Sequence, residues 1–196
     1  MIKYNETYRL ERGEIMPERI KELIYRLEHS RPENWDKIPD IDLYMDQIIG
    51  YMKRQHIGLE FDGDESLTPA MINNYMKSDL LPRAHGKKYD REHIGYLTAI
   101  CLLKQVMSVK EAGVLLESEM DHMDVEHFYE EYCRTVDAEY SSMADKVREC
   151  KDRETATRMA LELAVTVYAS MLACKELIAY IDEAAGKADG ADKSEK

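Results

Sequence analysis

A group of cationic side chains lies in the middle of an otherwise acidic chain. Residues 67–116 contain seven basic and four acidic residues, whereas the remainder holds 20 basic and 35 acidic ones. Cationic side chains bind phosphate groups, and phosphate contacts dominate the affinity of proteins for DNA. Arg83, Lys87 and Lys88 fall in a segment with one glycine, residues 82–90, that we expect to form a small β-hairpin or wing. The alternative is a solvated loop beside compensating acids.

A short helix over about 69–77 precedes this segment. Thr68 is suited to the N-cap position and Pro69 to the first helical position. Helical spacing places three apolar side chains toward the core, at Ile72, Tyr75 and Met76. The open face then holds the three polar ones, Asn73, Asn74 and Lys77. Asparagine can read adenine in the major groove, and lysine can reach phosphate or guanine.

Metal-type ligands gather in residues 117–131. Glu119 and His122 have the Glu-x-x-His spacing of di-iron helix bundles, and Asp124 and His127 echo it. Such sites need ligands from several helices, but here both pairs are expected on one helix. On that helix His122 and Glu126 could hold a surface metal, but only weakly. We therefore predict a solvated acidic face with no metal and no other cofactor.

The sequence contains no recognisable catalytic motif. The sequence has no glycine-rich phosphate loop, no His-Glu-x-x-His and no Gly-x-Ser-x-Gly. The four cysteines are far apart and form no Cys-x-x-Cys pair, which is typical of free thiols in a reducing cytoplasm. Their positions are Cys101, Cys133, Cys150 and Cys174. We expect a protein that is not an enzyme.

The elements that must position these residues are mostly helices. The 196 residues include only 9 Gly and 5 Pro, and 34% are charged, which argues against a turn-rich β fold. Asp40, Asp90 and the Ser108–Glu111 capping box indicate helix starts. Helices are predicted over about 15–29, 41–55, 69–77, 91–107, 108–117, 125–150 and 153–184, with a loop at 56–66 and a disordered tail at 186–196.

The cellular location is predicted from the charge of the first residues and from the length of the longest uncharged apolar run. The first residues are charged and lack the apolar stretch of a signal peptide. The longest uncharged apolar run, Leu163 to Cys174, is twelve residues, fewer than the roughly 20 that span a bilayer. We predict a cytoplasmic protein with no membrane partner. The net charge of −12 excludes a uniformly basic nucleic-acid coat protein, but not a local basic patch.

The last third of the chain predicts self-association. Apolar and aromatic residues form a heptad seam from Tyr129 to Cys150, and the following helix is apolar on nearly every side between Leu161 and Ile181. One small domain has too little surface to cover both. We expect a homodimer built on one or both of these helices.

The central window resembles a known DNA-binding unit. Met71 to Tyr75, the exit Leu80-Leu81-Pro82, the basic segment Arg83 to Tyr89 and the cap Ser108 to Glu111 resemble, in order, the headpiece of MerR-type transcription regulators. The span from Ile38 to Leu116 resembles an uncharacterised bacterial domain of unknown function related to that headpiece.

The resemblance implies a mainly α fold, a MerR-like winged helix-turn-helix with a C-terminal helical dimerisation or effector region. The expected parts are an N-terminal helix and connector (1–37), the winged domain (38–117), the helical region (118–185) and the tail (186–196). The implied function is a regulator that binds double-stranded DNA through Asn73, Asn74, Lys77, Arg83, Lys87 and Lys88, with room for a small-molecule effector. The alternative is a helical protein-interaction module that keeps the fold without binding DNA.

Overall fold

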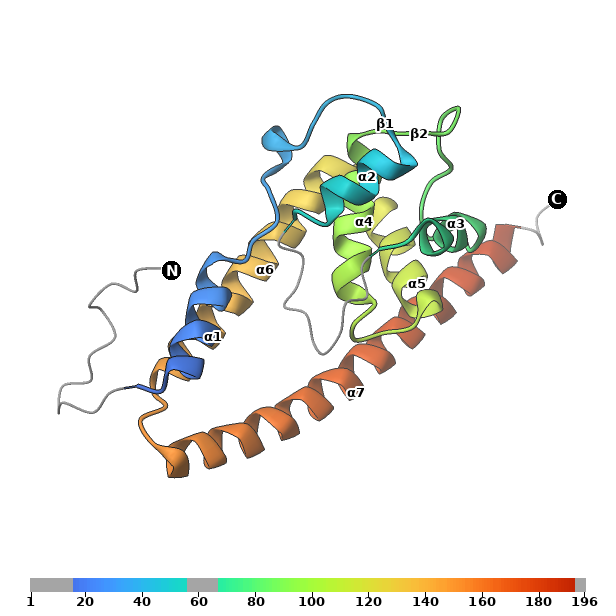
Figure 1. Ribbon diagram of the computed structural model, residues 1–196. Coiled ribbons are helices and arrows are strands. Elements are labelled where there is room, and N and C mark those ends of the chain that lie inside the picture. The colour runs from blue at the N-terminus through green and yellow to red at the C-terminus, as the bar shows by residue number, and fades with distance from the viewer. Residues whose placement is uncertain (1–15, 56–66, 193–196) are drawn as a thin grey trace.

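The computed structural model describes residues 16–55 and 67–192, and within them the protein is mainly helical, as predicted (Figure 1). The N-terminal elements are α1 (Glu18–His29), a 3₁₀ helix η2 (Trp35–Lys37), β1 (Leu43–Tyr44), α2 (Met45–Met52) and α3 (Pro69–Lys77). Then follow β2 (Lys88–Tyr89), α4 (Arg91–Leu103), α5 (Val109–Met120), α6 (Val125–Arg148) and α7 (Arg153–Asp192).

Three helices begin at the predicted caps. The Thr68 hydroxyl accepts a hydrogen bond from the Met71 backbone at 3.2 Å, and the Asp90 carboxylate accepts one from the His93 backbone at 3.2 Å. The Ser108 cap is reciprocal, because its backbone N–H also donates to the Glu111 carboxylate at 2.7 Å. Each bond satisfies a backbone donor that the first helical turn leaves without a partner.

Replacing Ser108 with alanine should lower the free energy of unfolding by about 1 kcal/mol, because the N-terminus of α5 loses its side-chain acceptor. Urea unfolding followed by circular dichroism measures the loss. Ser142→Ala is the control, since Ser142 is exposed inside α6 and alanine favours a helix interior. An equal loss in both variants would contradict a capping role for Ser108.

The start of α2 differs from the prediction. Asp40 does not cap this helix, which begins after Tyr44, and the Tyr44 N–H donates to the Gln47 side chain at 2.8 Å. Leu43 and Tyr44 instead form β1, which pairs antiparallel with β2 in the register Leu43↔Tyr89. This pairing with a segment far along the chain extends the backbone where the local sequence favours a helix start.

The main core surrounds α4. Its residues Ile94, Leu97 and Ile100 are fully buried, and they share one cluster with Ile72 of α3 and Leu81 after it. The same cluster includes Phe128 and Tyr129 from the start of α6. The first turns of α6 therefore belong to the same packing unit as the helices before it.

Tyr129 joins three elements of this core. Its ring lies 5.5 Å from the Trp35 ring of η2, centroid to centroid, and its hydroxyl donates to the Glu33 carbonyl at 2.7 Å. Gly95 of α4 allows the close approach, because a Cβ at that position would lie 3.1 Å from the Trp35 ring. Burial raises the pKa of the Tyr129 phenol well above its ordinary value, so the hydroxyl stays protonated and donates.

The heptad seam of α6 is covered within the chain. A second core cluster packs Ile24 and Leu27 of α1 against Ala144 and Val147 near the end of α6. Arg31 fixes the end of α1 there, with its Nε 2.8 Å from the Asp137 carboxylate. Of the two helices that we expected to form a dimer, α6 has its apolar seam covered by α1. Helix α7 is therefore the one whose apolar surface is available to a second chain.

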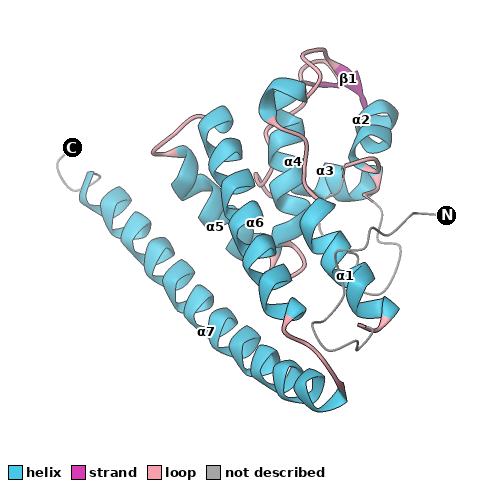
Figure 2. Cartoon of the chain, turned by 90° about the vertical axis from the view of Figure 1, so that its left-hand side faces the viewer, coloured by secondary structure: helices cyan, strands magenta, loops and turns pink. Residues whose placement is uncertain are grey.

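Helix α7 runs along one side of the molecule, as Figure 2 shows. It packs against α5, where Ile178 is buried and Lys110 lies 2.9 Å from Asp182, and Lys146 of α6 lies 2.7 Å from Glu162. The helix continues to Asp192, so the tail predicted to be disordered from residue 186 is helical over most of its length. This part holds two alanines, which favour a helix, and two glycines, which weaken one, so its composition alone does not account for the helix. Residues 193–196 lie outside the described residues.

Candidate nucleic-acid interface

Helix α3 presents the polar face that its spacing predicts. Ile72 and Tyr75 are buried in the core, while Asn73, Asn74 and Lys77 are exposed. The buried side chains fix the rotation of the helix about its axis. The exposed ones are therefore held on a common open face rather than on a mobile loop.

The chain leaves α3 through a tight exit. Asp79 has a positive φ of 54°, a conformation that aspartate tolerates better than most residues. The N–H groups of Leu80 and Leu81 both donate to the Tyr75 carbonyl, at 2.9 and 3.2 Å, and both leucines are buried. This anchored turn sets the direction in which the following segment leaves α3, and in Figure 1 the wing loop rises from the end of that helix.

The segment 82–90, which we call the wing, contains a two-residue hairpin turn. His85 and Lys88 exchange backbone hydrogen bonds of 2.9 and 3.0 Å, and the residues between them have positive φ, 58° at Gly86 and 70° at Lys87. Such turns match the twist of paired strands. The turn puts Lys87 at the exposed tip of the wing. The predicted segment thus forms a turn closed by a single bridge, and its second side continues into β2, which pairs with β1 and not with the first side of the turn.

The base of the wing carries its own counter-charges. Lys88 lies 3.6 Å from the Asp42 carboxylate and 5.9 Å from the centroid of the Tyr44 ring, and Arg91 lies 3.8 Å from Asp40. Burial alone would raise the pKa of Asp90, but hydrogen bonds from His93 outweigh it and lower that pKa. Asp90 therefore stays ionised as the cap of α4 while it fixes the end of the wing.

The remaining predicted cations are unpaired within the described part of the chain. Lys77, Arg83 and Lys87 are exposed and form no ion pair with residues 16–55 or 67–192. The acidic loop 60–65, which would neutralise this face in an interaction module, lies outside the described residues. We call the exposed set of Asn73, Asn74, Lys77, Arg83 and Lys87 the α3–wing face.

The acidic histidine cluster has a structural role. Helix α5 ends at Met120 and α6 begins at Val125, so the two Glu-x-x-His-like pairs straddle a helix junction, and the expectation of a single helix was wrong. Asp124 caps α6, accepting from the His127 backbone at 2.9 Å and lying 2.7 Å from the His127 ring. No group of three or more metal-type ligands lies close together among the described residues.

The four cysteines are free thiols. Burial raises the pKa of Cys101 and of Cys133 to about 11, so at neutral pH both side chains carry their proton. A protonated thiol is a poor nucleophile and a poor metal ligand. These two positions therefore act as small apolar groups in packing.

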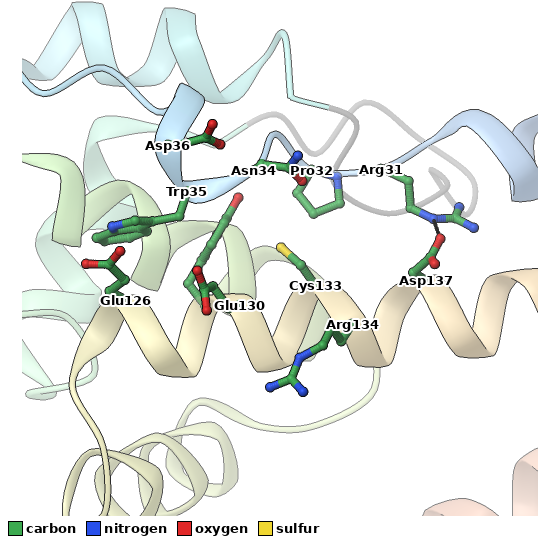
Figure 3. Close-up of a pocket in the computed structure, with 11 residues that line it drawn as sticks. Arg31, Pro32, Asn34, Trp35, Asp36, Glu126, Glu130, Cys133, Arg134 and Asp137 are labelled. Carbon is green, nitrogen blue, oxygen red and sulfur yellow. Dashed lines mark hydrogen bonds and ion pairs between the residues drawn. The ribbon is translucent and has the colours of Figure 1, made fainter.

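A cleft that no sequence pattern predicts opens between η2 and α6 (Figure 3). Trp35 and Glu126 lie at one end, and Arg31 faces Asp137 at the other. The second arginine of the cleft, Arg134, lies 3.6 Å from Glu131. With both arginines engaged, the carboxylates that remain give the cleft a negative surface, unlike the α3–wing face; these are Asp36, Glu126 and Glu130.

Comparison with known proteins identifies the family. No curated protein and no solved structure matches the chain. Residues 33–132, just over half of the chain, match the family described as "Domain of unknown function (DUF1836)". The match begins just before η2 and ends in α6, and so covers the elements that share the main core. The chain belongs to the DUF1836 family.

Proposed function

We propose that this protein is a DNA-binding transcription regulator whose α3–wing face contacts duplex DNA, as in the MerR-like headpieces it resembles. The observation that carries the proposal is the exposed face itself. Helix α3 and the wing that follows it together expose three cations with no ion pair among the described residues and two asparagines, in a chain of net charge −12. Exposed cations that the protein does not neutralise are available to phosphate groups.

The two parts of the face suit different contacts. An α-helix fits the major groove, where asparagine side chains can pair with the edge of adenine. In this arrangement α3 offers Asn73 and Asn74 to bases, and Lys77 to a phosphate or a guanine. The wing extends Arg83 and Lys87 toward the sugar-phosphate backbone, where such contacts set position and register rather than sequence. Lys88, held by Asp42, supports the strand pairing and contributes less.

The second candidate is a protein-interaction module without DNA binding. The ion pairs at the base of the wing favour it, because Asp40 and Asp42 neutralise Arg91 and Lys88. A protein partner would use the shape of this face more than its charge. Binding to DNA, by contrast, must depend steeply on salt, because neutralised phosphates release counterions.

Fluorescence anisotropy with a labelled random duplex distinguishes the two. We expect binding at low ionic strength that weakens with added KCl, with a slope of about −0.9 in log K against log salt for each phosphate contact. Three contacts from Lys77, Arg83 and Lys87 correspond to a slope of about −2.7. No salt-dependent binding at low ionic strength would overturn the regulator proposal in favour of the interaction module.

Asn73→Ala and Asn74→Ala test base reading. For a duplex selected from a random pool, we expect losses of about 1–3 kcal/mol in binding free energy when a base contact is removed, with much smaller losses on random DNA. Anisotropy titrations with both duplexes give the difference. Asn34→Ala, which removes an exposed asparagine from the connector, is the matched control. Equal losses on the two duplexes would show that neither asparagine reads sequence.

A further inference from the structure

Helix α7 carries an apolar stripe that faces away from the rest of the chain. Its members follow one another at steps of four, three and four residues, the spacing of a coiled-coil seam. Large fractions of their surfaces are exposed: Leu161 69%, Val165 61%, Tyr168 72% and Leu172 53%. Met159 and Ile178, which contact the rest of the chain, lie outside this stripe on other sides of the helix. We call these four exposed residues the outer stripe.

We propose that the outer stripe is covered by the same stripe of a second copy, with the two α7 helices antiparallel. The stripe is symmetric about its centre. Antiparallel pairing places Leu161 opposite the partner's Leu172, and Val165 opposite the partner's Tyr168. Every apolar member then meets an apolar member, and the contact is closed by a two-fold axis, as in most homodimers.

Charges at the two ends of the stripe select this orientation. Arg158 lies one step before Leu161, and Glu176 lies one helical turn after Leu172. In the antiparallel pair, Arg158 lies opposite Lys175 of the partner subunit and beside Glu176 of the partner subunit, so each end of the apolar contact holds one attractive and one repulsive pair. A parallel pair would place only like charges in register at these positions, with Arg158, Lys175 and Glu176 each against its own copy. Like charges in register destabilise such a pair.

A second copy suits α7 better than a bilayer does. Among the described residues, the stretch 153–185 is the one helix that passes a length and composition test for a membrane span, and only 6% of its most apolar window is buried. Its charge-free run, Leu163 to Cys174, would span only about 18 Å at 1.5 Å per residue, against a hydrocarbon core of about 30 Å. Glu162, Lys175 and Glu176 bound that run. Placing these charges beside a helix–helix contact in water costs less free energy than burying them in a bilayer.

Light scattering on the full chain tests whether a second copy covers the outer stripe. At tens of micromolar the wild type should have twice the chain mass of 22.8 kDa. Leu172→Glu should give a monomer with unchanged helicity, because Leu172 is exposed in the single chain. Ala173→Glu is the matched control, an exposed neighbour outside the stripe, and should remain dimeric. A monomeric wild type, or equal dissociation of both variants, would overturn the proposal. So would a wild type that is monomeric in solution and floats with phosphatidylcholine vesicles.

Charge reversal tests the orientation. Glu176→Arg should raise the dimer dissociation constant about tenfold, because it turns two attractive pairs into repulsive ones, whereas Arg158→Glu should change it little, because the new carboxylate faces Lys175 of the partner subunit as well as Glu176. The variant that carries both changes should recover wild-type dissociation, since the pairs re-form with reversed signs. A double variant as weak as Glu176→Arg would overturn the antiparallel arrangement. Circular dichroism confirms that each variant keeps its helices.

Discussion

Replacing Lys77, Arg83 and Lys87 together with alanine should abolish most of the salt dependence of duplex binding. If each cation contacts one phosphate, the wild type loses about 40-fold in affinity between 50 and 200 mM salt, and the slope of the triple variant is smaller by about 2.7. All duplexes should be affected alike, because phosphate contacts carry no sequence information. Anisotropy titrations over this salt range measure both quantities.

A matched triple variant controls for net charge. Arg19, Lys37 and Lys151 are also exposed, form no ion pair with other described residues, and lie on other elements. Their replacement by alanine changes the net charge equally and should leave the slope close to that of the wild type. Both triple variants should melt near the wild-type temperature, since exposed charges contribute little to stability. Equal changes of slope in the two would refute a specific α3–wing face.

Tyr129→Ala should be among the most damaging single changes in the chain. It removes a fully buried ring of α6 that packs against η2 and α4, and such truncations cost about 3–5 kcal/mol. A domain of this size has about 5–15 kcal/mol of stability in total. We expect a large fall in the urea midpoint and a loss of cooperative unfolding at 37 °C.

Two further variants separate the contributions of Tyr129. Tyr129→Phe keeps the ring but removes the hydrogen bond to Glu33, and should cost about 1–3 kcal/mol because a part-buried carbonyl loses its donor. Tyr180→Ala removes an exposed tyrosine from α7 and should change stability little. If Tyr129→Ala were as stable as Tyr180→Ala, the described packing around Tyr129 would be wrong.

Local signals explain what the sequence could predict of the fold. Thr68, Asp90 and Ser108 bond to the backbone three residues later, so their roles follow from neighbouring residues alone. Strand β1 could not be predicted in this way. Leu43 is extended because it pairs with Tyr89, 46 positions away, and nothing near Leu43 in the sequence encodes that partner.

The same contrast holds at the candidate site. Helical periodicity was enough to place Asn73, Asn74 and Lys77 on the open face, because Ile72 and Tyr75 fix that helix in the core. It could not show that Lys88 is paired with Asp42, because that contact depends on the register of β1 against β2. The negative cleft was missed for a similar reason. Trp35 and Tyr129, the two aromatic residues that line it, are brought together only by tertiary packing.

In the proposed dimer, the length of α7 would set the distance between the two α3–wing faces. In each chain the rest of the protein contacts α7 through α5, near Ile178. In the antiparallel pair, the two Ile178 positions lie about 35 Å apart along the helices, at 1.5 Å of rise per residue. Half-sites on one face of a duplex recur every 34–36 Å, or about one turn of roughly 10 base pairs. The preferred DNA site should therefore be an inverted repeat whose half-site centres are about one turn apart.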